Sequence, residues 1–154
     1  MSVPGQGINL HAALERYVAV MEALRADNLA SLDTVLTPEA RFVDPFNDVC
    51  GVAAIRAVFA HGFRQCPGMR FSVAARAVDG HRGLLRWRMT CDARTGGLAV
   101  EGMAELTLAP DGRVAEHVDY WDPAAQLYER VPVLGWLMRR IRRRLAVPAG
   151  RAGR

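Results

Sequence analysis

The sequence contains no lysine, few aromatic residues and no cysteine pair with the spacing of a metal site. All 20 basic residues are arginine, and aromatic side chains make up 7% of the 154 residues. Cys50, Cys66 and Cys91 form no Cys-x-x-Cys pair, which argues against a zinc site and favours free thiols in a reducing cytoplasm. The sequence also lacks an apolar run of the roughly 18 residues that a membrane-spanning helix needs. Glycine-rich phosphate loops and serine-centred nucleophile elbows are absent, so no cofactor and no metal are predicted.

What the sequence does contain favours one globular domain with a substantial core. Hydrophobic residues make up 51% of the chain, and its length suits a single domain. The first seven residues lack the charged and apolar regions of a signal peptide, which indicates a cytoplasmic protein.

Positive charge is concentrated at the C-terminal end. Seven of the 20 arginines lie between Arg139 and Arg154, where there is no acidic residue. The residues before Arg139 hold the other 13 arginines and all 16 acidic residues, a net charge of −3. Because the excess of positive charge is confined to the last segment, nucleic-acid binding by the domain is not predicted.

Two hydrophobic periods divide the chain into a helical first half and an extended second half. Apolar side chains at helical spacing predict helices over residues 10–26, 29–36 and 51–63. Strands are predicted where the period is two or the run is short, at residues 41–44, 69–78, 85–92, 98–108 and 113–121. This order predicts an α+β fold with helices covering one face of a curved antiparallel sheet. The same order of elements resembles the nuclear-transport-factor-2-like superfamily, which implies a cone-shaped sheet with the N-terminal helices packed on its concave face (a cystatin-like α+β roll). The predicted domain covers residues 8–130, followed by an amphipathic basic helix over 131–147 and a disordered tail over 148–154.

The alternation within the strands assigns side chains to the two faces of the sheet. One face of the first long strand is expected to carry Phe71, Val73, Ala75 and Ala77. The opposite faces of the later strands are expected to carry cross-strand charge pairs, or a dimer contact, formed by Arg86, Arg88, Glu101, Glu105 and Glu116.

Two short segments resemble ketosteroid isomerases of the nuclear-transport-factor-2-like superfamily. Arg16-Tyr17-Val18-Ala19 is similar to the segment that carries the family's oxyanion-binding tyrosine, and Val43-Asp44-Pro45 to the one that carries its general-base aspartate. Gly51 and Ala53-Ala54-Ile55-Arg56 extend the second match. The resemblance covers roughly residues 10–128 and implies a cone around an apolar pocket, with Tyr17 and Asp44 as catalytic residues.

The sequence departs from that family at its second oxyanion donor. The family has a protonated aspartate on the penultimate strand, and by register this position is Ala104. Glu101 and Glu105 are an odd number of residues from Ala104, so they are expected on the opposite face. A missing oxyanion donor typically lowers the rate by ~10²–10³.

The last predicted strand offers a second set of candidates. His117, Asp119 and Trp121 are two residues apart and are expected to share the pocket face. Asp119 resembles the acid/base aspartate of polyketide-cyclase-like members of the superfamily, and His117 would orient it. The pocket is expected to have an apolar wall formed by Phe42, Phe59, Leu85, Trp87, Met89 and Trp121.

Each candidate also has a purely structural interpretation. Asp44 can cap the turn that follows it, and Tyr17 can be a core residue with a tethered hydroxyl. His117 and Asp119 can form a hydrogen-bonded pair without chemistry. Trp87 and Trp121 can be ordinary core aromatics.

Residues 133–145 have the composition of a helix that lies on an anionic membrane surface. Leu134, Leu137, Met138, Ile141 and Leu145 fall on one helical face, and five arginines occupy the rest. The alternative is a helix that packs this apolar stripe on its own domain or on a second subunit. Peripheral contact with the inner face of the membrane is therefore one prediction for this segment.

The sequence is compatible with two functions. The first is a cofactor-independent isomerase or cyclase that moves a proton next to a carbonyl group of a small apolar or carbonyl-containing ligand. The second is a non-catalytic ligand-binding or dimerisation domain. A homodimer is expected in either case, because the sheet face of mixed charge would be exposed.

Overall fold

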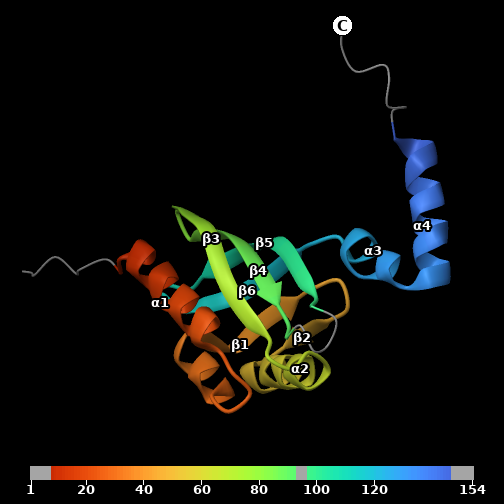
Figure 1. Cartoon of the computed structure of the whole chain (residues 1–154). Helices are drawn as coiled ribbons and strands as arrows, with labels where there is room; N and C mark the ends of the chain where they lie inside the picture. Colours follow the sequence, from red (N-terminus) through yellow and green to blue (C-terminus); the bar gives the residue numbers. More distant parts are fainter. Residues whose placement is uncertain (1–7, 93–96, 147–154) are drawn as a thin grey trace, which may run out of the picture. The chain divides into compact units, whose positions relative to one another are not determined.

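The computed structural model describes residues 8–92 and 97–146, which form parts of two compact units (Figure 1). The first unit ends at Trp121, and the second begins at Asp122. The predicted domain end at residue 130 falls within the second unit. The predicted disordered tail, 148–154, lies outside the described residues.

The first unit is built on a six-stranded sheet in the order β2-β1-β6-β5-β4-β3. The strands are β1 (Leu36–Val43), β2 (Asp48–Cys50), β3 (Arg70–Asp79), β4 (Arg82–Thr90), β5 (Ala99–Leu108) and β6 (Val114–Tyr120). The predicted antiparallel meander from β3 to β6 is confirmed. In contrast, β1 runs parallel to β6, so the sheet is not antiparallel throughout. The short strand β2, which follows β1 through a tight turn and pairs with it, was not predicted.

Two α-helices and a 3-10 helix pack on the sheet. They are α1 (Leu10–Ala23), η1 (Leu29–Thr34) and α2 (Val52–Gln65). Asn9 caps α1 by accepting a hydrogen bond from the Ala12 amide, as an N-cap asparagine commonly does. The C-terminal end of α1, at Ala23, comes earlier than the predicted end at residue 26. The Asn28 side chain folds back here and accepts a hydrogen bond from the Arg25 amide. Figure 1 shows α1 and α2 on the same side of the curved sheet.

The core lies between these helices and the inner face of the sheet. Leu14, Val18 and Ile55 from the helices pack in one cluster with Leu85 and Leu106 from the strands. Gly83 on β4 allows α1 to approach the sheet closely, because a Cβ at this position would lie 3.0 Å from Leu14 Cδ1. The predicted arrangement of helices on the concave face is therefore confirmed.

The outer face of the sheet carries the predicted charge pairs. Arg82 pairs with Glu105 at 2.7 Å, and Glu101 lies 3.9 Å from both Arg86 and Arg88. On β1, Arg41 contacts Glu116 of the neighbouring β6 at 2.9 Å. These pairs are exposed, so each contributes little to stability, but they place the charged side chains on the face opposite the core.

A bulge in β3 corrects the predicted alternation of that strand. The register shifts between Val73 and Ala75, so the predicted set is divided between the two faces. Phe71 and Val73 lie on the inner face, whereas Ala75 and Ala77 lie on the outer face, opposite the exposed Arg86 and Leu84. After the bulge, Arg76 pairs opposite the inward-facing Leu85 and forms an ion pair with Glu15 of α1 at 2.6 Å. The Val73 amide donates to the Glu22 carboxylate at 2.8 Å, which supplies an acceptor from α1 at the bulge.

The prediction of three free cysteines is wrong for two of them. Cys66 follows α2 and Cys91 follows β4, and the two residues form a disulfide with their Cα atoms 5.6 Å apart. Only Cys50 is a free cysteine, and it is exposed. The disulfide ties the C-terminal end of α2 to the end of β4.

The second unit is a compact helical segment. It contains α3 (Pro123–Gln126), the 3-10 helix η3 (Tyr128–Arg130) and α4 (Pro132–Leu145). Gly135 is buried against Glu129, where any added side chain would overlap the Glu129 backbone. Two arginines of α4 also hold Glu129. Arg139 donates to its carbonyl at 3.0 Å, and Arg142 pairs with its carboxylate.

Candidate functional site

An apolar cavity of about 50 Å³ lies inside the first unit, between α1, α2 and the inner face of the sheet. This volume is small compared with the ~300–1,000 Å³ of typical ligand sites, so a ligand needs side chains to move. Met21 lines the cavity, and its unbranched side chain is the kind that repacks readily. The full lining consists of Tyr17, Met21, Phe59, Phe71, Val73, Leu85, Trp87, His117 and Asp119.

Three of the four predicted catalytic residues form one hydrogen-bonded chain at this cavity. The Tyr17 hydroxyl lies 2.7 Å from Nδ1 of His117, and Nε2 of His117 lies 2.8 Å from Oδ1 of Asp119. Tyr17 comes from α1, whereas His117 and Asp119 come from β6, where alternation puts both on the inner face. The predicted meeting of these three side chains is therefore observed.

The protons of this chain can be assigned from the chemistry of its members. Burial, reinforced by the negative charge of Asp119, raises the pKa of the Tyr17 phenol well above its ordinary value of 10.0. The hydroxyl therefore stays protonated at neutral pH. An ionised Asp119 can only accept, so Nε2 of His117 carries the proton that lies between them. In the neutral imidazole, Nδ1 is then an acceptor, and it receives the Tyr17 hydroxyl proton.

His117 is buried with both ring nitrogens in hydrogen bonds, whereas Asp119 uses one of its two carboxylate oxygens. His117 is 4% exposed, and its ring lies beside the Phe42 ring with centroids 5.0 Å apart. Both imidazole nitrogens are already bonded. Asp119 uses Oδ1 for His117, and Oδ2 has no hydrogen-bond partner within residues 8–92 and 97–146. Asp119 is therefore the member of the chain that can accept a proton from a molecule in the cavity.

Trp87 presents a buried donor at the same cavity. Its Nε1 is buried and has no hydrogen-bond partner in the part of the chain that the structure describes. Such an unpaired donor is rare in protein interiors and calls for an explanation. Gly102 on β5 makes room for the indole, because a Cβ there would lie 2.6 Å from Trp87 Cζ2.

Asp44 is not among the residues that line the cavity. Its carboxylate accepts hydrogen bonds from the amides of Phe46 and Asn47, both at 2.7 Å, and from the Asn47 side chain. The structural interpretation of Asp44 as a turn cap thus describes its contacts. Its predicted catalytic role stays a prediction, with no contact to the other three candidates.

The predicted apolar wall is present in part. Phe59, Leu85 and Trp87 line the cavity, and Phe42 packs edge-to-face on Phe59 behind it. Met89 lies further along β4, opposite Val100, and Trp121 packs on Phe46 instead. Sequence analysis missed Met21, Phe71 and Val73 as wall residues. Helical spacing from Tyr17 could have identified Met21, and strand alternation could have identified the other two.

Ala104, the predicted position of the missing oxyanion donor, lies on the inner face of the sheet. Ala104 pairs with Asp119 across β5 and β6 and is 1% exposed, so its methyl group faces the core. Glu101 lies on the outer face with its arginine partners. Trp87, a donor at the cavity, lies on the neighbouring strand β4, two residues from Leu85, which pairs with Ala104.

Within the described residues, no group of three or more His, Cys, Asp or Glu side chains could hold a metal ion. No helix found in residues 8–92 and 97–146 is both long and apolar enough to cross a membrane.

A family model described as SnoaL-like domain matches residues 14–117. The chain belongs to the SnoaL-like domain family. The resemblance of the sequence to the nuclear-transport-factor-2-like superfamily, in its ketosteroid isomerase or polyketide cyclase-like branch, is confirmed at the level of this family. Asp119 lies just beyond the matched residues, on the same strand as His117.

Solved structures of related proteins share the fold at low sequence identity. A protein from Jannaschia sp. CCS1, provisionally assigned as a SnoaL-like polyketide cyclase, has a TM-score of 0.66 and 18% identity over 81% of this chain and 93% of its own. A provisionally assigned SnoaL-like isomerase from Agrobacterium tumefaciens has a TM-score of 0.61 and 21% identity over 75% of this chain and 99% of its own. An LEH-like epoxide hydrolase from M. tuberculosis has a TM-score of 0.63 and 12% identity, with coverages of 91% and 95%. A comparison with curated proteins finds no match.

Proposed function

We propose that this SnoaL-like protein binds a small carbonyl compound in the cavity and moves a proton on the carbon next to the carbonyl group. The observation that carries the proposal is the Tyr17–His117–Asp119 chain, which ends in a carboxylate oxygen at an apolar cavity. The assignments of similar structures as cyclase and isomerase are consistent with this chemistry.

The proposed reaction uses two groups at the cavity. Oδ2 of Asp119 takes a proton from the carbon, and the electron pair of the C–H bond moves onto the carbonyl oxygen to give an enolate. Trp87 Nε1–H donates a hydrogen bond to that oxygen, which would satisfy the buried donor. When the substrate is β,γ-unsaturated, the enolate is conjugated with the carbon–carbon double bond. Return of the proton from Asp119 to the γ carbon re-forms the carbonyl group and leaves the double bond between the α and β carbons, an isomerisation with no change in overall composition. His117 holds Asp119 in place, and Tyr17 holds His117.

A non-catalytic ligand-binding or dimerisation domain is the second candidate. It is favoured by the small volume of the cavity and by Ala104 at the position of the family's second donor. In that case the hydrogen-bonded chain orders the interior and recognises a polar group of a ligand.

Turnover by an asparagine variant separates the two functions. The probe is a small cyclic β,γ-unsaturated ketone, whose conjugated product is followed by ultraviolet absorbance. Asp119→Asn keeps the shape of the side chain but removes the base, so we expect a rate loss of ~10²–10⁴. Trp87→Phe removes only the N–H donor and should lower the rate by ~10²–10³.

Asp44→Asn tests the predicted catalytic role of Asp44 separately, because Asp44 is engaged in its turn and does not line the cavity. Its rate should stay within a few-fold of that of the unchanged protein. Equal rates for all four proteins would contradict the proposed catalysis. Binding of the ketone without turnover, measured by calorimetry, would support the second candidate.

We also propose that the protein forms a homodimer through the outer face of its sheet. Leu84, Met103 and Tyr120 are 41%, 51% and 58% exposed on this face. Met103 pairs directly with Tyr120, and charged pairs surround this apolar row. Apolar side chains ringed by polar ones are a common composition of subunit interfaces.

A further inference from the structure

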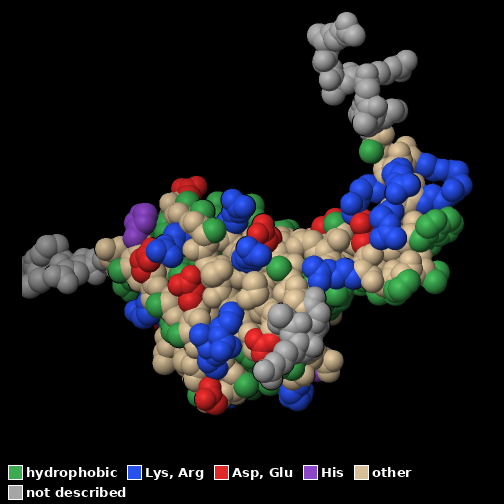
Figure 2. All heavy atoms as spheres, in the orientation of Figure 1, with side chains coloured by type: hydrophobic (Ala, Val, Ile, Leu, Met, Phe, Trp, Pro, Cys, Tyr) green, Lys and Arg blue, Asp and Glu red, His purple; other side chains and the backbone are tan. Residues whose placement is uncertain are grey.

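Helix α4 has two opposite faces of different chemistry. Leu134, Leu137, Met138, Ile141 and Leu145 recur at helical spacing and form a continuous apolar stripe. Trp136, Arg139, Arg140 and Arg143 recur at the same spacing, two residues out of phase, and therefore lie on the other side. Figure 2 shows the arginine side chains gathered over this helix, with hydrophobic side chains beside them.

The second unit itself leaves the apolar stripe largely uncovered. Leu137, Ile141 and Leu145 are 43%, 46% and 83% exposed. The contacts with η3 are centred beside the stripe, where Gly135, Arg139 and Arg142 meet Glu129. Met138, Ile141 and Leu145 of the stripe line an open hollow together with Asp122 and Glu129. Glu129 therefore holds α4 against η3 while most of the apolar stripe stays exposed.

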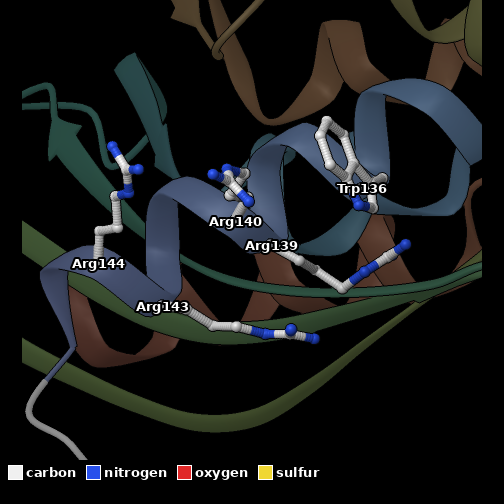
Figure 3. A pocket seen from close by; sticks show the side chains of 5 residues that line it. All are labelled: Trp136, Arg139, Arg140, Arg143 and Arg144. Carbon is white, nitrogen blue, oxygen red and sulfur yellow. The ribbon is translucent and has the colours of Figure 1, made fainter.

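The positive charge of α4 is also largely uncompensated. There is no acidic residue between Pro132 and Ala146, and Arg142 is the one arginine of α4 with an acidic partner among the described residues. Trp136 and four arginines, Arg139, Arg140, Arg143 and Arg144, line a hollow on the surface of this unit (Figure 3). The Arg140 guanidinium lies 5.8 Å from the centre of the Trp136 ring.

We propose that α4 binds the surface of an anionic phospholipid bilayer, with its apolar stripe in the interface and its arginines among the phosphate groups. A long apolar stripe flanked by arginine, with no acidic residue, is complementary in both polarity and charge to such a surface. Nucleic acid would be complementary to the arginines alone and would leave the stripe unused. The helix lies in the plane of the surface and is too short and too charged to cross the bilayer. This membrane contact is independent of the chemistry proposed for the cavity.

Vesicle co-sedimentation of the full chain tests the inference. The vesicles are phosphatidylcholine with and without phosphatidylglycerol. We expect the protein to sediment with the anionic vesicles alone and to be released by added salt. Arg140→Gln with Arg143→Gln should weaken binding by roughly 10–30-fold, given the usual contribution of each arginine at such a surface. Leu137→Gln with Ile141→Gln should weaken it about tenfold or more, because the stripe no longer enters the interface.

These variants keep the contacts of Arg139 and Arg142 with Glu129, so α4 should remain folded, as circular dichroism would show. The matched control is Arg16→Gln with Arg64→Gln, which removes the same charge from α1 and α2 and should bind like the unchanged protein. Equal binding by both α4 variants, no binding at all, or equal binding to neutral vesicles would overturn the proposal. Binding of an oligonucleotide that depends on the α4 arginines, with no binding of vesicles, would also overturn it. So would a stripe variant that binds vesicles normally but has a different oligomeric state in solution.

Discussion

At the scale of single residues, Tyr17 combines complete burial with a hydrogen bond to a buried histidine. Its pKa is raised in the folded protein, first by burial and then by the Asp119 charge. An unfolded chain would lose the same proton near the ordinary pKa of 10.0. Because the folded state keeps the proton longer, the stability that this group contributes is present below pH 10 and is lost as the pH rises further.

We therefore expect the free energy of unfolding to fall above pH 10 by about 1.4 kcal/mol per pH unit through Tyr17. Urea denaturation at several alkaline pH values measures this slope. Tyr17→Phe cannot titrate, so its curve should be flatter over that range. Tyr128→Phe, in the second unit, is the control and should keep the slope. A Tyr17→Phe protein with the same slope as the unchanged chain would contradict the assignment.

The residue scale also shows where sequence reasoning was limited. His117 and Asp119 were identified because alternation along β6 is a local property. Trp121 was assigned to the same face, but β6 ends at Tyr120, and beyond that residue the alternation no longer applies. Asp44 before Pro45 fits a pocket acid and a turn cap equally well. Its hydrogen bonds are local, whereas the direction of its carboxylate relative to a cavity depends on the whole fold.

At the scale of elements, the Cys66–Cys91 disulfide joins the end of α2 to the end of β4. The two cysteines are 25 residues apart, so the bond closes a loop that would otherwise be free in the unfolded chain. Loop-closure entropy for that length corresponds to about 3–4 kcal/mol of stability. We expect a reducing agent to lower the melting temperature measured by calorimetry.

The matched variant for this prediction is Cys66→Ser with Cys91→Ser, which should melt at the same lowered temperature with or without reductant. Cys50→Ser should behave like the unchanged protein, because Cys50 is not part of the bond. A melting temperature that is insensitive to reductant in all three proteins would show that the bond adds no stability.

The sequence patterns predicted which segments are helices and which are strands, but they did not predict the bulge in β3 or the disulfide. The long helices and the four meander strands carry strong periods, and their bounds differ from the predictions by only a few residues. The bulge in β3 was missed, because nothing in Val73-Ala74-Ala75 breaks the alternation of small and apolar residues. The register there depends on contacts from α1, where Glu22 bonds the Val73 amide and Glu15 pairs with Arg76. The disulfide was missed for the same reason, since two distant elements must meet before it can form.

At the scale of the whole molecule, the outer sheet face is the surface on which the proposed homodimer depends. Met103 pairs with Tyr120 on β6 and lies opposite Arg86 on β4, while Leu84 lies two residues from Arg86 on the same face. A glutamate at this position would add negative charge next to Glu101 and Glu105 of the same strand. Arg86 already lies 3.9 Å from Glu101, so the added carboxylate would compete for it, and burying the extra charge between two subunits would be costly.

We therefore expect Met103→Glu to convert a dimer into a monomer, with the particle mass measured by light scattering after size-exclusion chromatography. Because the side chain points away from the core, the melting temperature should change by little more than the loss of the dimer explains. Ile8→Glu is the control, since Ile8 is also an exposed apolar residue, 46% exposed, but precedes α1. That protein should remain dimeric. A monomeric unchanged chain, or a dimer in both variants, would contradict the proposal, and a monomer in both would move the interface away from the sheet.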